Sequence, residues 1–293
     1  MDTSISKKYK MVTDNLTNLL YLSNQLPLKH PNFYSRFIEL LDQQSIEYKL
    51  LPNTKDIWAV DYMPIQIDKN RFVQFRYNPN YLQYKKWINT ITNVDSVCDA
   101  LNIKPIRSAI ILDGGNVVKC ADKVIMCDKV FAENPTYTRN KLITELENVF
   151  EVEKIYFVPR QPKDFTGHAD GMIRFINSDT VLVNNYSKES KTFQQSFFNA
   201  INNTGLKCVE LVYNPYGNQK NTHANGIYLN YLQMQGNVIV PTFNIREDDE
   251  ALKIIEQIFP LQNVTAIDSN EIAIQGGILN CISWNIFSNI LSQ

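Results

Sequence analysis

Short apolar runs alternate with amphipathic segments along this whole chain of 293 residues. Strand-like runs at residues 108–112, 154–158 and 207–212 stand near helical patterns at residues 94–101, 138–150 and 191–202. Further strands are predicted at residues 15–22, 227–233 and 271–274. The order strand pair, helix, strand recurs about every 60 residues without a clear sequence repeat. No linker divides the chain, so we predict one α/β domain over residues 1–293.

The overall charge excludes some classes of protein. Lys and Arg number 29 and Asp and Glu number 30, which gives a formal net charge of −1. A general nucleic-acid binder needs a basic excess to neutralise phosphates, so we expect no nucleic-acid partner. The hydrophobic content of 44% is enough for a large core and argues against disorder.

The N-terminal segment and the cysteines bear on the compartment. Residues 1–22 lack the apolar stretch and small-residue cleavage site of a secretory signal, and no run approaches 18 apolar residues. The 5 Cys are odd in number and widely scattered, without zinc-ligand spacing. We therefore predict a cytoplasmic protein with no membrane association and with reduced thiols, one of which is free to act as a nucleophile.

Four segments place polar residues beside apolar strands, where sites tend to be held rigidly. Each has an ordinary structural explanation on its own: a surface carboxylate, an Asp-Gly turn, a hydrogen-bonded turn histidine and a buried cysteine. His168 and Asp170 would share one face of an extended segment. The other two histidines, His30 and His223, lie in unrelated contexts, so we predict no metal site. The four segments are Trp58 to Pro64, Asp113 to Asn116, Gly167 to Asp170 and Gln275 to Cys281.

Taken together, the segments indicate thiol chemistry. One Cys, one His and several isolated carboxylates, each at a turn near a strand and far apart in sequence, fit the general pattern of a nucleophilic cysteine site.

In order and spacing the four segments resemble those of the agmatine deiminase and bacterial peptidylarginine deiminase family, within the guanidino-group-modifying superfamily. That family carries Trp-x-Arg-Asp-x-x-Pro, acidic-Gly-Gly-Asn, Gly-His-x-Asp and Gly-Gly-Gly-x-x-x-Cys segments. The resemblance implies a five-bladed α/β propeller (pentein) of ββαβ modules with pseudo-five-fold symmetry around a central site. Five modules in 293 residues would take about 59 residues each, which agrees with the recurrence.

The resemblance also implies roles for individual residues. Cys281 would be the nucleophile, His168 the general acid and base, and Asp113 the group that orients His168. Asp170, counted among the catalytic groups, would hold the guanidinium together with Asp61. The remaining predicted substrate-binding residues are Trp58, Asn116, Gly276 and Gly277.

The chemistry requires these residue types. A guanidinium is planar and cationic, so paired carboxylates can hold its N–H groups and fix the carbon for attack by a thiolate. We predict hydrolysis of agmatine to N-carbamoylputrescine and ammonia through a covalent amidino-thioether on the cysteine, with no metal or organic cofactor. The sequence leaves open whether the protein assembles as a homodimer.

The sequence departs from the family beside these groups, so the reaction class is better supported than the substrate. Val60 stands where the family has Arg, Asn280 where agmatine deiminases often have His, and Gln275 where the first of three glycines would be. Trp284 and Asn285 replace a usual Gln-Gln pair. The alternatives are an amidinotransferase, which Asp113 favours over the Glu of many deiminases, a deiminase of arginine or peptidyl-arginine, or a non-catalytic protein that binds a guanidino ligand.

Overall fold

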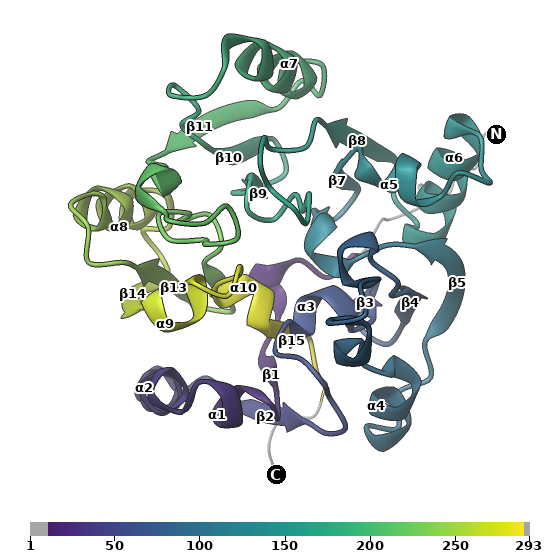
Figure 1. The fold of residues 1–293 in the computed structure, drawn as a ribbon, viewed down its shortest axis with the longest axis horizontal. Helices are drawn as coiled ribbons and strands as arrows, with labels where there is room; N and C mark the ends of the chain where they lie inside the picture. The colour runs from purple at the N-terminus through teal and green to yellow at the C-terminus, as the bar shows by residue number, and fades with distance from the viewer. Residues whose placement is uncertain (1–10, 290–293) are drawn as a thin grey trace, which may run out of the picture.

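Five three-stranded sheets stand around a common centre in the computed structural model, which describes residues 11–289 (Figure 1). In strand order the sheets are β15-β1-β2, β3-β4-β5, β6-β7-β8, β9-β10-β11 and β12-β13-β14. The strands are β1 (Leu19–Ser23), β2 (Tyr48–Leu51), β3 (Ile65–Gln66), β4 (Phe72–Arg76), β5 (Ile106–Ile111), β6 (Val118–Lys119), β7 (Lys123–Cys127), β8 (Lys154–Val158), β9 (Ile173–Phe175), β10 (Thr180–Asn184), β11 (Lys207–Leu211), β12 (Leu232–Met234), β13 (Asn237–Thr242), β14 (Asn263–Asp268) and β15 (Ser283–Ile286).

Each sheet has a central strand with one antiparallel and one parallel neighbour. In the third module, Ile125 of β7 pairs with Val118 of β6 across an antiparallel ladder and with Tyr156 of β8 across a parallel one. A parallel neighbour needs a long crossover, and a helix supplies it in each module. The described residues therefore form ββαβ modules, and the prediction of a five-bladed α/β propeller is confirmed.

The crossover helices lie on the outside of the ring (Figure 1). In α2, α6 and α7 the buried residues recur every four positions, as in Phe193, Phe197 and Ile201 of α7. Side-chain oxygens of Thr138 and Ser190 cap the first turns of α6 and α7. The α-helices are α1 (Leu26–Lys29), α2 (Pro31–Gln43), α3 (Ala59–Tyr62), α4 (Val94–Ala100), α5 (Lys129–Glu133), α6 (Arg139–Phe150), α7 (Lys191–Asn202), α8 (Glu247–Ile258), α9 (Asn270–Ala273) and α10 (Leu279–Ile282).

The two ends of the chain build one module together. Strand β15, near the C-terminus, pairs antiparallel with β1, near the N-terminus, with Trp284 opposite Tyr21. The Trp284 indole is buried, packs against the Tyr21 and Phe72 rings, and donates a hydrogen bond of 2.8 Å from Nε1 to the Pro64 carbonyl. Contacts between residues more than 200 positions apart thus close the ring.

Three strand predictions are wrong in whole or in part. Residues 15–22 begin in a 3₁₀ turn, η1 (Asp14–Leu16), and the strand starts only at Leu19. Within residues 227–233 only the last two residues are in a strand, and the Asn230 side chain turns inward to the Asp170 carboxylate and the Cys281 backbone N–H. Residues 271–274 belong mostly to α9, since Asp268 accepts a hydrogen bond from the Asn270 amide and starts a helical turn.

Across residues 11–289, the helices are all too short or too polar to span a bilayer.

Candidate active site

The four polar segments of the sequence meet at the centre of the ring. Asp113 follows β5, and the 3₁₀ turn η4 (Gly114–Asn116) comes directly after it. Asp61 lies on α3 and Cys281 on α10, while His168 and Asp170 lie in the turn before β9. The segment of His168 and Asp170 is a turn, so the expectation of an extended segment is wrong. A hydrogen bond from the Asp170 amide to the Gly115 carbonyl, 3.0 Å, holds that turn against η4.

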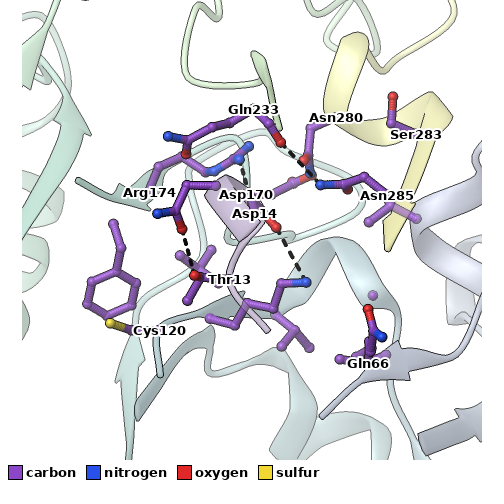
Figure 2. Close-up of a pocket in the computed structure, with 18 of the residues that line it drawn as sticks. Thr13, Asp14, Gln66, Cys120, Asp170, Arg174, Gln233, Asn280, Ser283 and Asn285 are labelled. Carbon is purple, nitrogen blue, oxygen red and sulfur yellow. Dashed lines mark hydrogen bonds and ion pairs between the residues drawn. The ribbon is translucent and has the colours of Figure 1, made fainter. Parts of the chain in front are cut away.

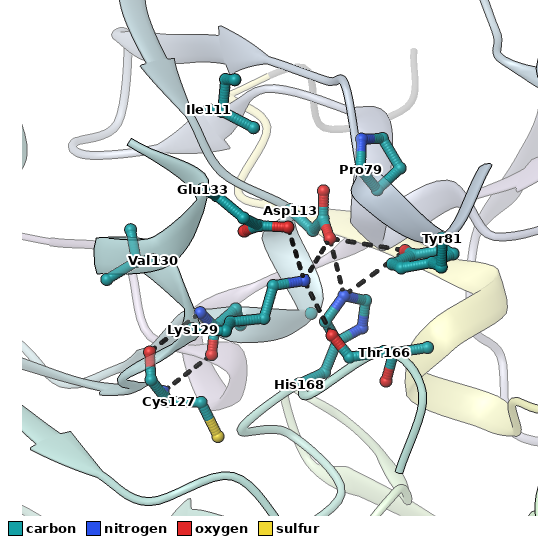
Figure 3. Close-up of polar contacts among 12 residues, drawn as sticks. Pro79, Tyr81, Ile111, Asp113, Cys127, Lys129, Val130, Glu133, Thr166 and His168 are labelled. Carbon is teal, nitrogen blue, oxygen red and sulfur yellow. Dashed lines mark hydrogen bonds and ion pairs between the residues drawn. The ribbon is translucent and has the colours of Figure 1, made fainter. Parts of the chain in front are cut away.

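The imidazole of His168 lies between two carboxylates. Its Nε2 is 2.9 Å from Asp113 Oδ2, and its Nδ1 is 3.4 Å from Asp61 Oδ1. All three side chains are buried. Figure 3 shows the contact of His168 with Asp113, together with Tyr81 and Lys129. A protonated imidazole can satisfy both carboxylates at once, because both of its nitrogens are then donors.

This arrangement shifts the pKa of each partner. Burial opposes the charge on His168, yet its pKa is raised to about 9 because Asp61 and Asp113 favour the imidazolium more strongly. Burial raises the pKa of Asp61 to about 7, and the nearby Asp113 and Asp170 add to the rise. Burial opposes the charge on Asp113 as well, but His168 and Lys129 together lower its pKa. These shifts favour an imidazolium at His168 beside the Asp113 carboxylate.

Asp170 faces the thiol from the other side of the site. Its Oδ2 accepts hydrogen bonds from Asn280 Nδ2 at 2.7 Å and from Asn230 Nδ2 at 3.1 Å, and it lies 3.9 Å from Cys281 Sγ. The Asn230 side chain also accepts a hydrogen bond from the Cys281 amide, 3.2 Å. Two amides therefore fix the carboxylate beside the sulfur. Asn280, where the family often has His, is one of them.

The surroundings of Cys281 disfavour its thiolate. Burial raises its pKa well above the usual range, and the charges of Asp170 and Asp61 raise it further. A cation placed between the two carboxylates would remove the effect of their charges. Positive charge between Asp61 and Asp170 would therefore favour the Cys281 thiolate.

Two glycines let groups of the site approach one another. A Cβ on Gly277 would stand 2.5 Å from Trp58 Cζ3 and 2.9 Å from Cys281 Cβ, so only glycine fits between the indole and the cysteine. A Cβ on Gly115 would stand 2.6 Å from Asp61 Oδ1 and 2.7 Å from His168 Nδ1. Gly276 has φ of +109° and lies near Phe165 and the Thr222 carbonyl.

Asn116 has a different place from the other predicted substrate-binding residues. Its amide is fully buried, accepts a hydrogen bond of 2.8 Å from the Cys127 N–H and donates one of 3.3 Å to the Cys127 carbonyl. These bonds attach the turn after Asp113 to strand β7. The side chain therefore serves the architecture of the site, and we do not assign it a substrate contact.

The sequence analysis missed four residues of the site. Asn230 interrupts the apolar run 227–232, and a polar residue in such a run is a usable signal. Lys129 and Glu133 are four positions apart on α5, and Tyr81 lies in η2 (Asn80–Leu82). Those three stand in segments with ordinary composition, so only their position in space reveals them.

A cavity of about 300 Å³ reaches Asp170 and Asn280 but is lined by neither His168 nor Cys281 (Figure 2). Its charged groups pair with one another: Asp14 is 2.7 Å from Arg174 Nη2 and 3.3 Å from Lys119 Nζ. Val60, at the position of the family's Arg, lines this cavity. The departure from the family at residue 60 therefore lies in the wall of this cavity.

Among residues 11–289, no group of three or more His, Cys, Asp or Glu side chains is placed to hold a metal ion. Each of the five cysteines is a free thiol, and Cys281 is half-buried.

The chain is similar in sequence to known proteins. Residues 24–286 match the model of the Porphyromonas-type peptidyl-arginine deiminase family. A putative agmatine deiminase of Vibrio parahaemolyticus is 22% identical over 273 residues, which cover 79% of this chain and 75% of that protein. An agmatine deiminase of Ectopseudomonas mendocina is 36% identical over 58 residues, 20% of this chain and 16% of that protein.

The fold is also that of solved structures. A cysteine-to-serine variant of C. jejuni agmatine deiminase with substrate bound superposes with a TM-score of 0.78 at 16% identity, covering 95% of this chain and 96% of that one. The family match spans most of the sequence, and the chain therefore belongs to the Porphyromonas-type peptidyl-arginine deiminase family of cysteine-dependent amidine hydrolases.

Proposed function

We propose that this chain hydrolyses the guanidinium group of agmatine to N-carbamoylputrescine and ammonia, through a covalent amidino-thioether on Cys281. The observation that carries the proposal is the placement of Asp61 and Asp170 on the two sides of the site. Asp61 touches His168 at 3.4 Å, and Asp170 touches the Cys281 sulfur at 3.9 Å. A cation held by both carboxylates would lie between the acid and the nucleophile.

Asp61 and Asp170 are both buried, and burial raises the pKa of each, so a bound cation would favour their ionised forms. A planar cation with N–H groups on several sides can donate to both carboxylates, which orients its carbon toward the thiol. Its charge also offsets the effect of Asp61 and Asp170 on Cys281, so substrate binding favours the thiolate.

The reaction then follows in two halves. When the cation binds, the Cys281 thiol loses its proton to solvent, and the resulting thiolate attacks the guanidinium carbon and gives a tetrahedral adduct. The imidazolium of His168 donates a proton to one amino group, the C–N bond breaks, and ammonia leaves an amidino-thioether. His168, now neutral, takes a proton from water as the oxygen attacks the same carbon. The C–S bond breaks and the thiolate returns, the remaining hydroxyl proton passes to solvent, where it protonates the released ammonia, and the ureido product leaves.

The choice of agmatine rests on relatives. Curated relatives from Vibrio parahaemolyticus and Ectopseudomonas mendocina carry the agmatine deiminase name, and the C. jejuni structure holds its substrate. Asp113 in place of Glu favours an amidinotransferase as the second candidate, in which an amine replaces water in the second half. Five free thiols support a reducing compartment such as the cytoplasm.

The test is incubation of the purified protein with agmatine, arginine and a peptidyl-arginine, followed by measurement of ammonia and ureido product. We expect turnover of agmatine above the other two. Cys281→Ala should show no detectable ureido product, while Cys208→Ala, which removes an exposed thiol, should match wild type. Added glycine tests for amidino transfer. If none of the three compounds reacts with reduced wild type, the proposal is wrong.

A further inference from the structure

A lysine is buried behind the catalytic histidine. Lys129 begins α5, and only 3% of its side chain is exposed. Its Nζ lies 2.8 Å from Asp113 Oδ2, 2.8 Å from the Thr166 carbonyl and 3.3 Å from Glu133 Oε1 (Figure 3). The ammonium also lies over the Tyr81 ring, 5.3 Å from its centroid. These four contacts hold the ammonium in the interior of the protein.

Lys129 and His168 compete for one oxygen of Asp113. Both donate to Oδ2, at 2.8 Å and 2.9 Å, the Tyr81 hydroxyl donates to the same oxygen at 3.4 Å, and among the described residues Oδ1 has no hydrogen-bond partner. The ammonium on this shared oxygen places a fixed positive charge close to the imidazole. Lys129 opposes the charge on His168, while Asp61 and Asp113 favour it.

Stability does not explain this lysine. Burying an ammonium among partly paired carboxylates is costly, and an apolar side chain of similar volume often stabilises a protein as well or better. Glu133, beside it, has a pKa raised by burial and by Asp113, so that ion pair is itself incomplete. The lysine needs another reason to be there.

We propose that Lys129 is a positioning residue for the proton of His168: its ammonium shares the Asp113 carboxylate with the imidazole and thereby keeps the imidazolium acidic enough to release its proton. The inference rests on the proposed deimination. There His168 must give a proton to the leaving nitrogen and take one from water in the same cycle. An imidazolium that donates to carboxylates at both nitrogens, with no cation nearby to weaken these contacts, would hold its proton too tightly to give it to the leaving nitrogen.

The charged and titratable neighbours of His168 come from several elements. They are Asp61 on α3, Tyr81 on η2, Asp113 after β5, Lys129 and Glu133 on α5, and Asp170 in the same turn. Lys129 is the cation of this group. A guanidinium bound at Asp61 would offset most of the effect by which Asp61 favours the imidazolium of His168. Lys129 would then oppose only the effect of Asp113.

A histidine NMR titration tests the inference without requiring turnover. The chain has only 3 His, so the His168 signal is assigned by its loss in His168→Gln. We expect Lys129→Gln to raise the pKa of His168 by about 1 unit, because a nearby like charge is removed. Lys129→Arg keeps the charge and should leave that pKa near the wild-type value. Lys119→Gln is the matched control. It removes the ammonium 3.3 Å from Asp14 Oδ1 and should leave the pKa of His168 unchanged.

The kinetic counterpart is a split between kcat and KM. Lys129 does not touch the substrate in the proposed mechanism, so Lys129→Gln should lower kcat about tenfold at pH 7 and leave KM nearly unchanged. If wild type turns over no guanidino compound, the proposed function is wrong. The titration still tests whether Lys129 lowers the pKa of His168, because it does not depend on turnover.

An unchanged or lowered pKa of His168 in Lys129→Gln would overturn the proposal. Lys129→Met is a second neutral variant that needs no polar partner. If neither neutral variant folds, as judged by circular dichroism, the ammonium serves stability and the positioning role is also refuted.

Discussion

At the scale of single residues, the protonation state of His168 is the central property of this protein. Two carboxylates from different modules, Asp61 and Asp113, face its two nitrogens. Burial alone would favour the neutral ring, but the carboxylates outweigh it and raise the pKa to about 9. The folded state thus binds the proton more tightly than the unfolded chain, whose histidine keeps its ordinary pKa near 6.5.

This difference predicts a dependence of stability on pH. A raised pKa contributes stability that is fully present below pH 6.5 and is lost as the pH rises through about 9. Between these limits, the free energy of unfolding of wild type should fall by about 3 kcal/mol relative to His168→Gln. Urea unfolding at a series of pH values measures the difference. His30→Gln is the control, since burial lowers the pKa of His30 and no such fall is expected above pH 6.5. A difference that stays flat across the range would contradict the prediction.

At the scale of elements, short connections hold the site more than the strands do. The turn η4 carries Asp113 into the centre, and its last residue, Asn116, bonds both backbone groups of Cys127 in β7. The turn before β9 is attached to η4 through the Asp170 amide. Asp113, His168 and Asp170 therefore keep their relative positions through two contacts between turns.

Asn116→Ala should destabilise the protein by about 2 kcal/mol, because a buried N–H and a buried carbonyl lose their partner. It should also lower activity, since Asp113 would no longer be held at its distance from His168. Urea unfolding and the ammonia assay measure the two effects. Asn203→Ala, at an exposed helix end, should change the free energy of unfolding by less than about 0.5 kcal/mol. Equal effects of the two substitutions would show that the Cys127 bonds are unimportant.

At the scale of the whole molecule, a single strand pairing closes the ring. Strand β15 joins β1 and completes a module whose other strand is β2, so the first and last modules in sequence are the same module in space. Cys281 lies on α10, directly before β15. The strand pairing that closes the ring therefore also fixes the position of Cys281.

Trp284→Ala should lower the free energy of unfolding by about 3–5 kcal/mol, because it removes a buried aromatic side chain and its hydrogen bond to Pro64. Amides of β1, such as those of Leu20 and Leu22, should then exchange with solvent faster than amides of β10. Trp284→Phe keeps the ring and should cost less than half as much. Uniform acceleration of exchange over all five sheets would contradict a local role in closure.

The sequence by itself determined the local parts of this protein. The helices at residues 191–202 and 138–150 follow from apolar spacing and capping residues, which act within one or two turns of chain. The segments that carry Asp61, Asp113, His168 and Cys281 are likewise local patterns, so the family and its fold could be inferred from them. The wrong strand at residues 271–274 shows the limit, because four residues hold too little pattern to separate a strand from a helical turn.

The tertiary structure alone decided how these groups act on one another. Charge, burial and hydrogen bonding depend on distances in space, and the pairs that matter are far apart in the chain: Asp113 and His168 by 55 residues, Cys281 and Asp170 by 111. Lys129 is an ordinary residue in the sequence, and only the tertiary structure places its ammonium on Asp113. The residue types follow from the sequence, whereas their protonation and their roles follow from the closed ring that brings them together.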